Sequence, residues 1–123
     1  MGHADALVAL RRDLEDAACL LGQPQDLRFQ PMFGGLMAYI GERPCAWLSA
    51  GGLALKLAPD DQPGLLAQPG AARLVAKPGA APSRSYVLVP ASIHRDAERF
   101  APWLARSIAA AKDRRRRGAA PRR

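Results

Sequence analysis

The sequence has few cysteines, few histidines and no long apolar segment, and each shortage excludes a class of protein. Two cysteines, Cys19 and Cys45, cannot form the disulfide framework of a small secreted domain. No apolar run approaches the roughly 18–20 residues of a membrane-spanning helix, and the longest, residues 46–57, is interrupted by glycines and Lys56. Acidic residues occupy the region where a signal peptide has its apolar stretch. We therefore expect a cytoplasmic protein that has no membrane partner.

Residue types for metal binding and catalysis are also sparse. His3 and His94 lie far apart in the sequence and show none of the closely spaced pairs that zinc sites use. Cys45 has no neighbouring histidine that would activate its thiol, so we interpret both cysteines as partly buried, small apolar residues. No serine lies in a nucleophile-elbow context. We expect no metal, no cofactor and no catalytic residue, and hence a protein that is not an enzyme.

The charge is concentrated at one end of the chain. A sequence of 123 residues, of which 49% are apolar, has the size and composition of one globular domain followed by a tail. Of the net charge of +7, residues 112–123 contribute +6 through seven basic residues and one aspartate, which leaves +1 for residues 1–111. We therefore expect a folded domain over residues 1–111 and a basic, disordered tail over residues 112–123.

The basic tail is the one feature that points directly to a ligand. Consecutive arginines attract phosphates and release condensed counterions, as nucleic-acid-binding arms do. The residues predicted to contact DNA or RNA are Lys112, Arg114, Arg115, Arg116, Arg117, Arg122 and Arg123. The alternative interpretation is a solvated terminus with only incidental affinity.

Apolar periodicity predicts a mixed α+β domain. A helix is expected over residues 5–21, strands over 36–40, 46–49 and 53–57, a short helix after Asp60, strands over 74–76 and 86–89, and a final helix that ends near Ala111. A further short strand at residues 27–29 is left open. Strands grouped in this way form an antiparallel, five-stranded sheet with helices packed on one face, a two-layer sandwich.

Five aromatic residues could stack on nucleic-acid bases: Phe33, Trp47, Tyr86, Phe100 and Trp103. The helical spacing of Phe100 and Trp103 favours a place in the core for both, and we expect Trp103 to be buried against the sheet. Phe33 and Tyr86 lie beside turns, and the sequence does not decide between core and surface for them.

Several short motifs occur in the order that one known family shows. They are Met32-Phe33-Gly34-Gly35, Tyr39-Ile40 with Gly41, Leu55-Lys56-Leu57, Ser85-Tyr86 with Val89-Pro90, and Trp103 with Ala105-Arg106. Together they resemble the TfoX amino-terminal domain family over about residues 7–112. Val87 and Leu88 depart from the tyrosine and glutamate of many members, and Met37 replaces a small residue. We interpret Gly34-Gly35 as a turn and not as a phosphate cradle, because no phosphate-loop pattern surrounds it.

The resemblance implies a fold like that of secretion chaperones, with the element order αβββαββα, and a link to the transcriptional control of competence genes. Full-length TfoX/Sxy regulators add a helical domain, where this sequence has its arginine-rich segment, so we expect a standalone amino-terminal domain. Two functional hypotheses follow. The first is a non-enzymatic binding domain, related to transcription and competence, that contacts nucleic acid through its tail. The second is a chaperone-like protein–protein interaction module, or a homodimer, that binds no nucleic acid.

Overall fold

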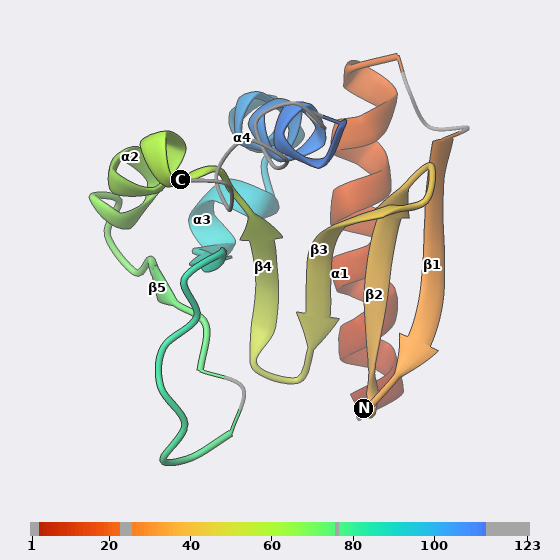
Figure 1. The fold of residues 1–123 in the computed structure, drawn as a ribbon. Coiled ribbons are helices and arrows are strands. Elements are labelled where there is room, and N and C mark those ends of the chain that lie inside the picture. The colour runs from red at the N-terminus through yellow and green to blue at the C-terminus, as the bar shows by residue number, and fades with distance from the viewer. Residues whose placement is uncertain (1–2, 23–25, 76, 113–123) are drawn as a thin grey trace.

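The computed structural model describes residues 3–22, 26–75 and 77–112. Its elements, labelled in Figure 1, are α1 His3–Leu20, β1 Leu27–Met32, β2 Gly35–Ile40, β3 Arg43–Ser49, β4 Gly52–Lys56, the 3₁₀ turn η2 Pro59–Asp61, α2 Gln62–Leu66, β5 Ala72–Arg73, β6 Tyr86–Val89, α3 Ala91–His94 and α4 Ala97–Lys112. The predicted α+β class is confirmed.

All strands join one antiparallel sheet in the order β1-β2-β3-β4-β6-β5. The antiparallel prediction is confirmed, but the predicted five strands and the order αβββαββα are wrong, because the sheet has six strands. The segment at residues 27–29, which the sequence left open, extends to Met32 as an edge strand that pairs with β2 along its whole length. The strand predicted at 74–76 is instead the two-residue β5, Ala72–Arg73, which pairs with β6.

The helices and one face of the sheet enclose the core. In Figure 1 the sheet stands in front of α1, and α4 crosses near the upper ends of the central strands. Side chains from alternate strand positions pack there against α1, α3 and α4. The strand residues that belong to this core and are fully or almost fully buried are Ala38, Ile40, Cys45, Ala46, Leu48, Leu53, Leu55, Val87 and Val89. This face is aliphatic, and its small alanines let the helices approach the sheet closely.

The final helix begins where Asp96 caps it. The Asp96 Oδ1 accepts hydrogen bonds from the amides of Glu98 and Arg99 at 3.1 and 3.4 Å, which satisfies two donors of the first turn. Phe100 is fully buried, as predicted. Trp103 is only half-buried, and its ring lies beside Gly64 of α2, so the prediction that it packs on the sheet is wrong.

Two polar side chains hold the layers together from inside. The Ser107 hydroxyl of α4 is fully buried and donates a hydrogen bond of 2.7 Å to the carbonyl of Cys45, which lies where the register of β2 and β3 shifts. The Gln62 amide donates to the carbonyls of Leu57 and Arg84 at 3.0 and 2.7 Å. Arg73 donates in turn to the Gln62 side-chain oxygen at 2.6 Å. These contacts join α4 to β3 and α2 to both neighbouring strand ends.

Candidate binding surface

The predicted tail site lies almost entirely outside the described residues. Lys112 is the last residue of α4 and is exposed, whereas the six predicted arginines fall in the segment 113–123. The structure therefore locates only Lys112 among the residues predicted to contact nucleic acid, and the contacts themselves stay predictions.

The motif Met32-Phe33-Gly34-Gly35 forms the tip of the β1–β2 hairpin. Phe33 and Gly34 both have positive φ angles, 52° and 78°, which gives the tight turn that suits the twist of paired strands. The predicted turn at Gly34 is confirmed. Phe33 is 94% exposed and adopts a left-handed conformation that costs a residue with a side chain roughly 1–2 kcal/mol. A large aromatic residue thus occupies a strained, exposed position without burying apolar surface within the described residues.

Gly35 is glycine for a different reason from Gly34. A Cβ atom at this position would lie 2.4 Å from the carbonyl oxygen of Leu48 and 2.7 Å from the Trp47 ring. The indole of Trp47 therefore rests on the backbone of β2, and any side chain at Gly35 would displace it. The pair gives the sheet a flat aromatic surface close to the hairpin tip.

Strand pairing defines a second, uncovered face of the sheet. Paired residues point to the same face, and one row crosses all strands through Gln30, Met37, Trp47, Ala54, Leu88 and Ala72. Its members alternate with core residues, so the row faces away from α1 and α4. Among the described residues no helix lies over this face. In Figure 1 the uncovered face is turned toward the viewer, and α1 lies behind the sheet.

Side chains on the uncovered face lie across neighbouring strands. The Tyr86 hydroxyl on β6 is 3.7 Å from the sulfur of Met37 on β2, so the ring spans the positions between them. The Arg28 guanidinium lies 5.2 Å from the centre of the Tyr39 ring and also donates to the Gly41 carbonyl at 3.2 Å. Such stacking holds both the cation and the ring in place.

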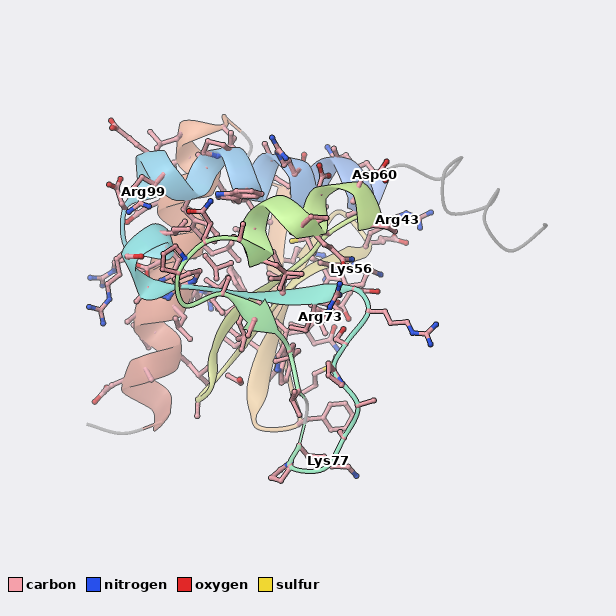
Figure 2. All side chains as sticks on the ribbon, turned by 90° about the vertical axis from the view of Figure 1, so that its left-hand side faces the viewer. Arg43, Lys56, Asp60, Arg73, Lys77 and Arg99 are labelled. Carbon is pink, nitrogen blue, oxygen red and sulfur yellow. The ribbon has the colours of Figure 1, made fainter. Side chains whose placement is uncertain are left out.

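The charged residues within the strands are all cationic. They are Arg28, Arg43, Lys56 and Arg73, while every acidic side chain of the described chain lies in a helix, a turn or a loop. Lys56 is the strand partner of Tyr86, and Arg28 is the strand partner of Tyr39. All four residues therefore belong to the uncovered face. Arg73 turns toward Gln62 instead. In Figure 2 the strands are seen from the β5–β6 edge, with α1 on one side and Arg43 and Lys56 toward the other.

The structure groups one pair of side chains that resembles an acid–base pair. His94 lies in α3, and its Nδ1 is 2.7 Å from Oδ2 of Asp13 in α1. The two side chains are only 8% and 20% exposed, and they connect α1 to α3. Asp13, His94 and Ser49 line one surface depression of about 230 Å³. The Ser49 hydroxyl oxygen, however, accepts a hydrogen bond from the Gly51 amide at 3.2 Å. This arrangement explains the packing of the two helices.

The cysteines differ in environment. Burial raises the pKa of the Cys45 thiol to about 12, which makes it a poor nucleophile. Cys19 is exposed on α1, so the prediction that both cysteines are partly buried is wrong for this one. Within residues 3–22, 26–75 and 77–112, no three His, Cys, Asp or Glu side chains are grouped so that they could hold a metal ion.

The model of the TfoX N-terminal domain family matches residues 20–111. The chain belongs to this family. The matched region of this TfoX N-terminal domain starts at the end of α1 and includes every strand, the Phe33 hairpin and nearly all of α4. The resemblance inferred from the short motifs is thereby confirmed. Searches among curated proteins and among solved structures find no match. In the described part of the chain, no helix has the length and apolar character needed to span a membrane.

Sequence reasoning missed the functions of Gln62, Ser107 and the Asp13–His94 pair, whose partners are distant in sequence. The uncovered face did leave a signal. This signal is the alternation of Met37 and Tyr39 with buried residues along β2. The structure also separates the five aromatic candidates into three environments. Phe100 is in the core and Trp103 is within the helix layer, whereas Trp47, Tyr86 and Phe33 belong to the other side or to its rim.

Proposed function

We propose that this TfoX N-terminal domain is a non-enzymatic nucleic-acid-binding domain. The observation that carries the proposal is the uncovered sheet face. There the cationic side chain of Arg28 is stacked on the Tyr39 ring, and Lys56 is paired with Tyr86 on the neighbouring strand. The arginine-rich segment 113–123 adds positive charge in the same chain. Both features attract phosphates through counterion release. A link to the transcriptional control of competence genes, which the family resemblance implies, fits this chemistry.

The polar groups of the domain support binding more than catalysis. The Asp13–His94 pair is largely buried and connects two helices. The Cys45 thiol is buried, with its pKa raised to about 12. General acid–base or nucleophilic catalysis requires such groups to meet a substrate in a cleft, at a pKa near neutrality or as a thiolate. On the uncovered face the strands instead contribute the cations Arg28 and Lys56 and aromatic rings, which suit recognition of a polyanion.

The proposal is tested with the full-length chain and fluorescently labelled oligonucleotides. Anisotropy titrations across a salt series should show affinity that falls steeply with salt. If about six phosphates are contacted, the log–log slope on duplex DNA should be near −5, at ~0.9 per contact. A variant with Arg114, Arg115, Arg116 and Arg117 changed to Gln lowers the net charge from +7 to +3 and should give a shallower slope. Absence of binding to duplex and single strand at low salt would refute the proposal.

A second candidate function is protein–protein interaction, with a homodimer as its simplest form. Phe33 favours it, because this ring is 94% exposed at a strained hairpin tip and exposed aromatic residues are frequent interface anchors. Sedimentation of the full-length protein and of Phe33→Asn across a concentration series tests the homodimer. A dimer that Phe33→Asn dissociates would support this function, and a monomer at every concentration would exclude the homodimer.

A further inference from the structure

The uncovered face carries more information than a cationic surface alone. Its aromatic residues lie on the sheet itself and not on flexible loops. Trp47 rests on the Gly35 backbone, Tyr86 reaches across to Met37, and Tyr39 is stacked with Arg28. Each side chain is half-buried, so its conformation is held by the sheet while part of it remains accessible. Such rigid rings are suited to contact another flat ring at a low cost in conformational entropy.

Charge decides among the partners that such a face could accept. A second copy docked face to face would bring the cationic residues Arg28 and Lys56 toward a surface with the same charges. A nucleic-acid duplex offers phosphates, but its bases are stacked inside and cannot reach the rings. A single strand offers phosphates and unstacked bases together. Sheet surfaces with aromatic residues bind two or three bases in this way.

We infer that the uncovered sheet face binds single-stranded nucleic acid, with bases stacked on Tyr39, Trp47 and Tyr86 and with phosphates near Arg28 and Lys56. This inference rests on the proposed nucleic-acid function and assigns it a surface and a strand type. The central residue of the row, Ala54, is fully buried, so the surface that a base would meet is formed by the larger side chains around it. The arginine-rich segment then adds affinity that does not depend on base sequence.

The two tryptophans of the chain supply a matched pair for the test, because Trp47 lies on the uncovered face and Trp103 in the helix layer. Trp103→Phe leaves Trp47 as the only indole, and Trp47→Phe leaves Trp103. Both full-length variants are titrated with oligothymidylate of about ten nucleotides and with a duplex of the same length. We expect the single strand to quench Trp47 fluorescence strongly and to leave Trp103 fluorescence unchanged. The duplex should quench neither indole.

Affinity for the single strand supplies a second readout. Tyr39→Leu keeps an apolar side chain on the sheet but removes the stacking ring, and should weaken binding roughly 5- to 150-fold, the loss typical of one stacked base. Trp103→Leu, which removes a comparable ring with its own arginine neighbour Arg106, should leave affinity unchanged. Thermal melts of each variant establish that it is folded at the temperature of the titration.

Four outcomes would overturn the inference, and they separate it from the function on which it rests. Binding of the single strand without quenching of Trp47, abolished by the arginine-to-glutamine tail variant, would place the contact on the tail and leave the proposed function standing. Equal quenching by poly-glutamate would show recognition of charge without bases. A change of Trp47 emission with protein concentration alone, accompanied by a dimer in sedimentation, would assign the face to a second copy. No binding of any nucleic acid at low salt would refute both proposals.

Discussion

The two faces of the sheet are built from the same strands and differ in almost every property. On its four middle strands the covered face has an aliphatic row, with alanines at Ala38 and Ala46 and larger side chains at Leu55 and Val87. The uncovered face has the tyrosines, Trp47 and two of the strand cations, Arg28 and Lys56. Side chains alternate with a period of two along a strand, so one short segment can specify both faces independently. Residues that build the core and residues that form the uncovered face thus alternate along each strand.

The largest expected contrast concerns thiol reactivity. With its pKa raised to about 12, Cys45 has about one thiolate in ten thousand molecules at pH 8, because the raised pKa keeps the thiol protonated there. Cys19 is exposed. Iodoacetamide at pH 8 should therefore label one cysteine of the native protein and both in denaturant, as read by mass spectrometry. Rapid labelling of both in the native protein would show that the covered face opens readily.

Removal of the Phe100 ring tests the covered side directly. Phe100 is fully buried among the helices and the sheet, and Phe100→Ala should lower the free energy of unfolding by roughly 3–5 kcal/mol. A domain with about 5–15 kcal/mol in total would be severely weakened. Tyr39→Ala, on the uncovered face, should cost only about 1 kcal/mol. Urea denaturation measures both changes, and equal losses would contradict the assignment of the two faces.

The Ser107 hydroxyl should contribute less than a core ring but more than a surface hydroxyl. Its donation to the Cys45 carbonyl is buried, so Ser107→Ala leaves that acceptor without this donor and should cost roughly 1–3 kcal/mol. Ser92→Ala is the matched control, because Ser92 is exposed on α3, and it should change stability by less than about 0.5 kcal/mol. Similar small effects for both serines would mean that the backbone at the register shift adjusts to the loss.

The sequence specified most elements because each carries its own local signal. The amphipathic α1, the glycine turns and the Phe100 helix all follow from periodicity and turn chemistry. The edge strand β1 was underestimated because the alternation of Leu27 and Phe29 with polar residues stops at Pro31, although an edge strand tolerates a proline. Trp103 was misplaced because helical spacing identifies a face but not the element that covers it. Here Gly64 of α2 occupies the position beside its ring.

The candidate surface was less predictable than the fold. Which aromatic residues share a face depends on strand register, and the shift between β2 and β3 at Ala38 and Tyr39 cannot be deduced from local sequence. The Asp13–His94 contact joins residues separated by 81 positions, and no short-range pattern marks it. The cationic character of the strands, in contrast, could be read from the sequence once their bounds were known.

The smallest expected effect concerns Phe33, which belongs to neither face and should respond in the opposite direction to Phe100. Its left-handed backbone costs roughly 1–2 kcal/mol for a residue with a side chain, and at 94% exposure its ring recovers almost none of this by burial. Asparagine tolerates the left-handed conformation better. Phe33→Asn should therefore raise the free energy of unfolding by up to about 1 kcal/mol, measured by the same urea denaturation. If Phe33→Asn instead lowers stability, the ring packs against this chain in solution. If it raises stability, the hairpin tip retains a residue that weakens the fold, and the reason for the phenylalanine must be sought in what the tip contacts.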